Sequence, residues 1–415
     1  MKRSFLLMML LMCMTAVTTN AQKYLGGDIS MLPKYEEANA VYRDKTGKVI
    51  PDVIQFMKEQ GMNAMRVRLF VDPSKAPADD KIEGVWQNLE YVKALGKRIK
   101  DAGLYFLLDF HYSDTWTDPG QHAKPSDWSS LTVAQLTEKM YTYTKESLEA
   151  LKNFGAEPDA IQVGNELNVG QLWNTGYAAP WDNNSKRENF INFEKSAITA
   201  CREVCPQAKV VFHVAMNYHS DGNSNNNSYI RGWAQVLKDN SVDYDIMGIS
   251  YYPYYHGSLA ELETLLTYME TNFPDKQLQL VETGYPHSWY PEDAKYNYTS
   301  VYPDTPEGQR QFTAALVEKL NAHSQVSGLY WWYPEANGNY RSDAGWYNMG
   351  LWNNSTNRAQ PALYELKAFL NDPSGINELK KVNRQQPVSY NLQGQCVDAD
   401  YRGIAIQNGK VVVMK

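Results

Sequence analysis

The segment from residue 64 to residue 110 contains one complete strand–helix–strand unit. It reads Ala-Met-Arg-Val-Arg-Leu-Phe at 64–70, has a helix-like pattern at 85–101, and continues as Leu-Tyr-Phe-Leu-Leu-Asp-Phe at 104–110. Short apolar runs that alternate with longer helical segments are typical of α/β proteins with a parallel sheet. The fold class therefore depends on how often this unit recurs.

The alternation recurs along most of the chain. We expect eight strands, near 25–29, 64–70, 104–110, 160–163, 209–214, 245–250, 279–281 and 328–332. Helical patterns lie between them at 51–60, 85–101, 131–154, 187–204, 229–238, 259–272 and 307–323. Eight repeats predict a (β/α)8 barrel with insertions. The alternative is a doubly wound open sheet, but Gly26-Gly27-Asp28 lacks the glycine spacing of a phosphate-binding first turn.

Both ends of the chain differ from the expected barrel. Residues 1–21 have a basic start and an apolar run, which is the pattern of a signal peptide, so we expect export to the periplasm, the cell surface or the medium. The alternatives are a short transmembrane anchor, for which an apolar run of about 13 residues is too short, and a lipoprotein anchored at Cys13. The barrel should span 22–372. A breaker cluster at 371–375 predicts a linker, and the alternating pattern that follows predicts a small β-rich tail within 373–415.

Composition limits the classes of partner. The 415 residues carry a formal net charge of −7 and no dense Lys/Arg run, which argues against nucleic acid and anionic membranes. The chain has 11 Trp and 29 Tyr, and many of them lie beside polar or Gly/Pro residues rather than in apolar runs. Aromatic side chains in such places often stack on flat ligands such as sugar rings. We expect a polysaccharide partner, a monomer, and no transmembrane helix.

Polar residues cluster where the predicted strands end, and in such barrels catalytic groups occupy the C-terminal ends of strands. Glu166 follows the fourth strand and Glu282 ends the seventh. Glycoside cleavage commonly needs a protonated carboxyl for the leaving oxygen and a second carboxylate that attacks or activates water. A salt bridge to a neighbouring helix is the alternative role for either residue alone.

Arg66 and Arg68 share one face of the second strand. Two guanidinium groups inside a barrel need carboxylate partners. We expect Arg66 to hydrogen-bond Glu282 and keep it ionised, whereas a structural pair with Asp109 is the alternative. For Arg68 we expect a structural role.

Several motifs resemble glycoside hydrolase family 53, the endo-β-1,4-galactanases. They lie between residue 27 and about residue 352 and include Asp-Phe-His-Tyr-Ser-Asp-Thr-Trp-Thr-Asp-Pro-Gly at 109–120, Gly-Asn-Glu-Leu-Asn at 164–168, Gly-Gln-Leu-Trp at 170–173, Gly-Ile-Ser-Tyr-Tyr-Pro at 248–253 and Glu-Thr-Gly-Tyr at 282–285. One departure is Trp-Trp-Tyr-Pro at 331–334, where a pattern ending Trp-Glu-Pro is expected.

The resemblance implies a retaining double displacement on galactan or arabinogalactan, with Glu166 as acid/base and Glu282 as nucleophile. It also implies that Asn165 binds a sugar hydroxyl, that Arg66 holds Glu282, and that further residues line the same subsite: His111, Tyr251 or the adjacent Tyr252, and Trp332. We expect Trp116 and Trp173, which lie in loops, to extend the cleft, although bracing of those loops is the alternative.

No cofactor is needed for this chemistry, and no catalytic metal is indicated. Bacterial members of the family can hold a structural calcium ion between the last two βα loops, which here contain Glu292, Asp293, Asp304, Asp343 and Asn348. Acidic surface loops without a metal are the alternative. Two other functions stay open at this point: hydrolysis of another β-1,4-glycan such as mannan or xylan, and non-catalytic glycan binding.

Overall fold

The computed structural model describes residues 22–217, 227–338 and 346–371, together with the backbone of four short strands between 389 and 414. The predicted signal peptide, residues 1–21, lies outside the described residues. The chain divides into two compact units, residues 1–371 and 372–415.

The first unit is a closed barrel of eight parallel strands, in the order β1-β12-β11-β10-β9-β6-β5-β4. The (β/α)8 prediction is confirmed, and every predicted strand is present with ends shifted by at most a few residues. The strands are β1 (Tyr24–Asp28), β4 (Ala64–Leu69), β5 (Tyr105–Phe110), β6 (Ala160–Val163), β9 (Lys209–Ala215), β10 (Ile246–Tyr251), β11 (Gln277–Thr283) and β12 (Val326–Trp332).

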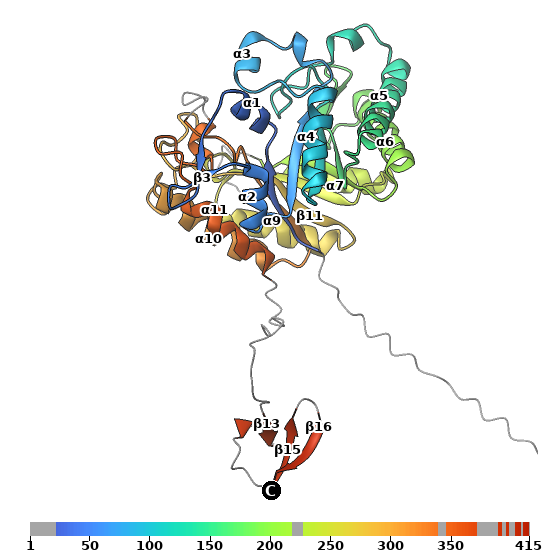
Figure 1. Cartoon of the computed structure of the whole chain (residues 1–415). Coiled ribbons are helices and arrows are strands. Elements are labelled where there is room, and N and C mark those ends of the chain that lie inside the picture. The colour runs from blue at the N-terminus through green and yellow to red at the C-terminus, as the bar shows by residue number, and fades with distance from the viewer. Residues whose placement is uncertain are drawn as a thin grey trace, which may run out of the picture. The chain divides into compact units, whose positions relative to one another are not determined.

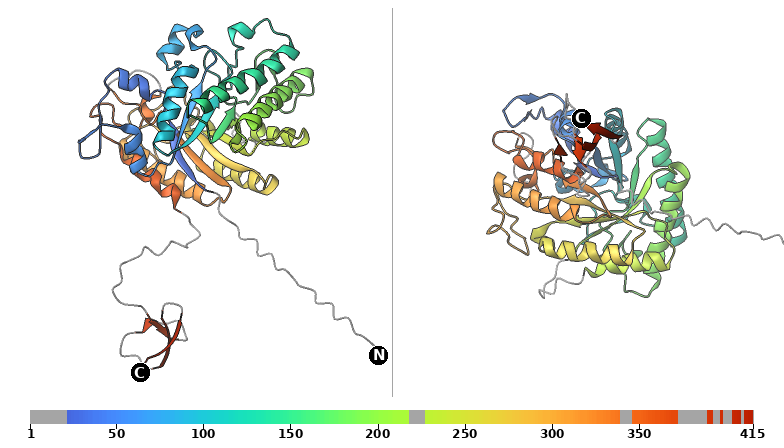
Figure 2. Two further views of the ribbon diagram at one scale, coloured as in Figure 1. Left: turned by 45° about the vertical axis from the view of Figure 1, so that its right-hand side comes forward. Right: turned by 90° about the horizontal axis from the view of Figure 1, so that it is seen from below.

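Helices form an outer ring around these strands (Figure 1), and two further views give the same arrangement (Figure 2). They are α2 (Val53–Glu59), α4 (Leu89–Asp101), α5 (Val133–Asn153), α6 (Ser185–Val204), α7 (Ser228–Asp239), α9 (Leu259–Asn272), α10 (Pro306–Asn321) and α11 (Pro361–Glu365). Capping boxes begin α5 at Thr132 and α9 at Ser258, because each side chain accepts a hydrogen bond from a backbone N–H of the first turn.

Insertions at the strand ends include α1 (Leu32–Glu37), β2 (Tyr42–Arg43), β3 (Val49–Ile50), α3 (Ala78–Ile82), β7 (Gly170–Gln171), β8 (Gly176–Tyr177) and α8 (Pro253–His256). Within the described residues, no helix is long and apolar enough to cross a bilayer. The second unit contains a four-stranded antiparallel sheet of β13 (Ser389–Asn391), β14 (Cys396–Val397), β15 (Gly403–Gln407) and β16 (Lys410–Met414).

The interior of the barrel changes from apolar to polar along the strands. Seven strands each contribute one residue to an apolar layer: Ala64, Leu107, Ala160, Val211, Ile246, Val281 and Tyr330. Two residues further along, the same faces present Arg66, Asp109, Gln162 and His213, because side chains alternate with period two. The polar layer therefore lies at the carboxyl ends of the strands.

Candidate active site

Arg66 is the centre of the polar layer and is fully buried. Its Nη1 lies 2.8 Å from Asp28, and its Nη2 lies 2.7 Å from Asp109 and 2.9 Å from Glu282. The two partners weighed from the sequence, Glu282 and Asp109, are thus both present. Arg68 pairs with Asp28 at 2.8 Å, in agreement with the structural role expected for it.

A bulge in β11 directs Glu282 into the barrel. Ile249 of β10 pairs with Leu280, but the next residue, Ser250, pairs with Glu282, so Val281 is the extra residue. Because Ser250 faces the interior, where its Oγ lies 2.8 Å from His213 Nε2, Glu282 opposite it faces the interior as well. Regular alternation would have sent Glu282 to the other face of the sheet.

Glu282 also accepts a hydrogen bond from the Tyr252 hydroxyl at 3.1 Å. Burial raises the pKa of the Glu282 carboxyl to about 7, against the opposing effects of Arg66 and of the Tyr252 hydrogen bond. Arg66 therefore favours the ionised form of the Glu282 carboxyl, and burial outweighs this effect.

Glu166 lies just beyond β6 in a left-handed backbone conformation, with φ of +46°. Such a conformation is costly for a residue with a side chain, and backbone contacts to two histidines hold it here. The N–H of Glu166 donates to His213 Nδ1 at 3.1 Å, and its carbonyl oxygen lies 3.2 Å from His122 Nε2. Burial, and then the negative charge of Glu282, raise the pKa of Glu166 well above its usual value.

The Asn165 side chain is held at both of its polar atoms. Its Oδ1 accepts from Arg66 Nη2 at 3.0 Å, and its Nδ2 donates to the Thr117 carbonyl at 2.7 Å. His111 lies behind this amide, with Nε2 3.1 Å from Asp109 and Nδ1 2.8 Å from Thr117 Oγ1. Burial lowers the pKa of His111, so the ring is neutral at neutral pH.

These groups open into a pocket of about 200 Å³ at the barrel mouth. Aromatic rings form much of its wall, and Arg68 supports two of them, with its guanidinium 4.7 Å from the Trp332 ring centre and 4.9 Å from that of Trp116. The lining residues are Glu83, Trp116, Thr117, Asp118, Gln121, Asn165, Glu166, Tyr252, Glu282, Trp332, Tyr333 and Trp346.

The model of glycosyl hydrolase family 53 matches residues 24–369. The chain belongs to this family. It is 32% identical over 324 residues to an arabinogalactan endo-β-1,4-galactanase of Thermothelomyces thermophilus, covering 76% of this chain and 90% of the relative. It is 29% identical over 333 residues to arabinogalactan endo-β-1,4-galactanase A of Aspergillus niger. That match covers 79% of this chain and 89% of the relative.

Solved structures agree with this family assignment. The GH53 catalytic domain of Ignisphaera aggregans superposes with a TM-score of 0.71 at 27% identity, covering 84% of this chain and 96% of that one. A fungal β-1,4-galactanase superposes with a TM-score of 0.69 at 29% identity, covering 84% and 99%. A family 10 endo-β-1,4-xylanase, at 13% identity and a TM-score of 0.54, shares the fold alone.

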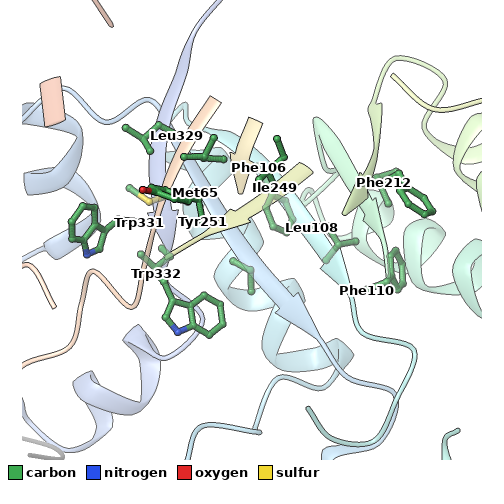
Figure 3. Packing of buried hydrophobic residues seen from close by; sticks show 14 of the residues in the cluster. Met65, Phe106, Leu108, Phe110, Phe212, Ile249, Tyr251, Leu329, Trp331 and Trp332 are labelled. Atoms are coloured by element: carbon green, nitrogen blue, oxygen red, sulfur yellow. The ribbon is translucent and has the colours of Figure 1, made fainter. Parts of the chain in front are cut away.

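In this family 53 chain, four of the residues expected to bind substrate do not line the pocket, and Arg66, which contacts Glu282 from within the polar layer, is one of them. Tyr251 points away, because alternation along β10 places it on the face opposite to Ser250, and its hydroxyl donates to the Gly257 carbonyl at 3.0 Å. Figure 3 shows it among buried apolar side chains, and Trp331 and Trp332 pointing in different directions. Of these two adjacent tyrosines, Tyr252 is the one that lines the pocket.

His111 and Trp173 are the other two. His111 lies one layer behind the pocket, as described above. Trp173 is half-buried in the β7–β8 hairpin, where its ring centre lies 5.6 Å from that of His122 and 4.7 Å from that of Tyr177. It is therefore outside the pocket, on the Glu166 side.

Sequence reasoning missed Trp346 and Glu335. Trp346 lies in the loop after β12, with its ring centre 5.1 Å from Tyr252 and 6.3 Å from Trp332, and no local pattern marks it. Glu335 is buried, accepts from the Met31 N–H at 2.9 Å, and has its pKa raised to about 8 by burial and the nearby Asp28. The sequence feature that could have identified Glu335 is its position directly after Pro334, at the end of the Trp-Trp-Tyr-Pro motif.

In the described part of the chain, the candidate calcium loops do not assemble a ligand set, because no group of three or more His, Cys, Asp or Glu side chains there is placed so that it could hold a metal ion. Asp293 accepts from the Tyr255 hydroxyl at 2.7 Å, and Asn348 donates to the Trp289 carbonyl at 2.5 Å. Asp343 lies outside the described residues. No step of the chemistry below involves a metal.

Proposed function

We propose that this chain is a retaining endo-β-1,4-galactanase in which Glu282 is the nucleophile and Glu166 the acid/base. The proposal rests on one observation: Glu166 and Glu282 line the same pocket, and of these two carboxyls it is Glu282 that contacts Arg66 and Tyr252. The names of the relatives support galactan or arabinogalactan as the substrate rather than mannan or xylan.

In the first step the Glu282 carboxylate attacks the anomeric carbon, and the glycosidic oxygen takes the proton of Glu166 as the leaving chain departs. The raised pKa of Glu166 keeps that proton available. Once Glu282 is esterified its charge is gone, so the pKa of Glu166 falls. Glu166 then takes a proton from water, which attacks the anomeric carbon and releases Glu282.

The roles of Glu166 and Glu282 can be distinguished by measuring each variant on two substrates. Glu166→Gln should strongly reduce hydrolysis of galactan but reduce hydrolysis of an aryl galactoside with an activated leaving group much less, because such a group needs little protonation. Glu282→Gln should abolish both reactions. Equal losses on the two substrates for Glu166→Gln would contradict its role as acid.

Stereochemistry tests the mechanism independently. The first-formed reducing end should be the β-anomer in proton NMR, because two inversions at one carbon restore the configuration. An initial α-anomer would exclude Glu282 as nucleophile.

We also propose that the chain is exported, which the N-terminal sequence supports. Amino-terminal sequencing of the mature protein should begin at about Gln22.

A further inference from the structure

Four aromatic side chains outside the pocket form a group at the barrel mouth. Trp173 and Tyr177 lie in the β7–β8 hairpin, Trp181 follows it, and Tyr229 lies in the first turn of α7. Trp181 is 58% exposed and Tyr177 is 43% exposed. Large rings this exposed leave apolar faces in water, which is informative when they are grouped rather than scattered.

The four rings are neighbours in space. Ring centres are 4.7 Å apart for Trp173 and Tyr177, and 4.8 Å apart for Trp181 and Tyr229. The two pairs belong to one segment, because Trp181 follows Tyr177 by four residues and Pro180 between them packs against Gly232 of α7, the helix that carries Tyr229. We call these four residues the aromatic band.

The loop that carries the band is held firmly. Gly170 pairs with Tyr177 across the hairpin, and Trp173 Nε1 donates to the Val169 carbonyl at 3.2 Å. A Cβ on Gly232 of α7 would lie 2.7 Å from Pro180, so the helix packs closely against the residue before Trp181. The backbone that carries these rings therefore needs little ordering when a ligand binds.

The band starts beside Glu166 and extends away from it. His122 connects the two, since its Nε2 lies 3.2 Å from the Glu166 carbonyl oxygen and its ring faces Trp173 at 5.6 Å. Glu166 protonates the oxygen of the leaving sugar under the proposed function. The leaving part of the chain must then lie on the Glu166 side, opposite to the wall formed by Trp332 and Trp346.

We propose that the aromatic band binds the leaving, reducing-end part of the galactan chain and so extends the cleft beyond the pocket. The flat faces of the rings are suited to the C–H faces of galactose units, and no hydrogen-bond pattern is required. This inference rests on the proposed function, because it uses Glu166 as the acid to assign the side.

The test compares galactan with an aryl β-1,4-galactobioside, which carries no sugar on the leaving side. For Trp181→Ala, and for Tyr229→Ala, the ratio of kcat/KM on galactan to kcat/KM on the aryl substrate should fall about threefold to tenfold, mainly through KM on galactan. Tyr229→Phe keeps the ring and should keep the ratio. Phe154→Ala removes a ring that is 44% exposed at the end of α5 and should also keep it.

If the ratio of kcat/KM on galactan to kcat/KM on the aryl substrate is unchanged in both alanine variants, the inference is overturned. It is also overturned if kcat/KM falls equally on the two substrates and the melting temperature is lowered. Failure of the proposed function gives a different result. In that case Glu282→Gln would still hydrolyse galactan, whereas failure of the band alone leaves wild-type hydrolysis and its loss in Glu282→Gln intact.

Discussion

One arginine connects the acidic residues of this site. Arg66 contacts three carboxylates, and Asp28 is shared with Arg68. Removing Arg66 would leave two buried carboxylates, Asp109 and Glu282, without their cation, which is far more costly than losing one surface ion pair. Arg66 does not hold the pKa of Glu282 at a low value, because burial of the carboxyl raises that pKa, and the charges of Asp109 and Asp28 raise it further.

The pH dependence of kcat/KM should follow these two carboxyls. Activity needs Glu282 ionised and Glu166 protonated. As the pH falls below about 7, Glu282 takes up a proton and kcat/KM declines. As the pH rises through the higher pKa of Glu166, that residue loses its proton and kcat/KM declines again.

Tyr252→Phe should move the acid limb of this profile to higher pH by about one unit, because the lost hydrogen bond favours the ionised form of Glu282. The alkaline limb should move less. The measurement is kcat/KM on galactan from pH 4 to pH 10. Tyr251→Phe, whose hydroxyl bonds Gly257 instead, is the matched control. An acid limb that stays in place or moves to lower pH in Tyr252→Phe would contradict the assignment.

At the scale of elements, the site depends on two departures from regular strand geometry. The bulge at Val281 turns Glu282 inward, and the close approach of β1 to β4 brings Asp28 to Arg66. Gly26 permits that approach, because a Cβ there would lie 2.0 Å from the Ala64 carbonyl oxygen. β1 and β4 therefore lie close together where Asp28 contacts Arg66.

Gly26→Ala should lower the free energy of unfolding by about 1–3 kcal/mol, since the added methyl overpacks the barrel wall. Because it moves β1 against β4, it should also reduce kcat. Gly155→Ala is the control: its Cβ meets nothing within 4 Å, and only its φ of +80° is unfavourable, at a cost of about 1 kcal/mol. Urea unfolding and galactan turnover measure the two effects. Gly26→Ala with wild-type stability would show that β1 can shift freely.

For the whole molecule, the chain contains two units of different character. Every residue assigned to the site lies in the unit that ends at residue 371, and the family match ends at residue 369. The second unit is a small antiparallel sheet, β13 to β16, whose hydrogen bonds run within that unit. Catalysis should therefore need only the first unit.

A chain that ends at Asp372 should retain wild-type kcat and KM on galactan and melt at the same temperature as the barrel of the full chain. Any effect of the deletion should be on export or attachment, which cell fractionation measures. A truncated protein that folds, as judged by circular dichroism, but no longer hydrolyses galactan would place part of the catalytic machinery in residues 373–415.

Sequence patterns are enough to predict the barrel, its eight strands and the carboxyls at the ends of β6 and β11. These features follow from local rules, because strand and helix periods are properties of neighbouring residues. The tertiary structure decided the rest. Only the pairing of β11 with β10 reveals the bulge that turns Glu282 inward, and only the alternation set from Ser250 selects Tyr252 over Tyr251. Likewise, Trp346 lines the pocket from the loop after β12. Closure of the barrel places it beside residues that are far away in the sequence, and no local sequence pattern indicates that neighbourhood.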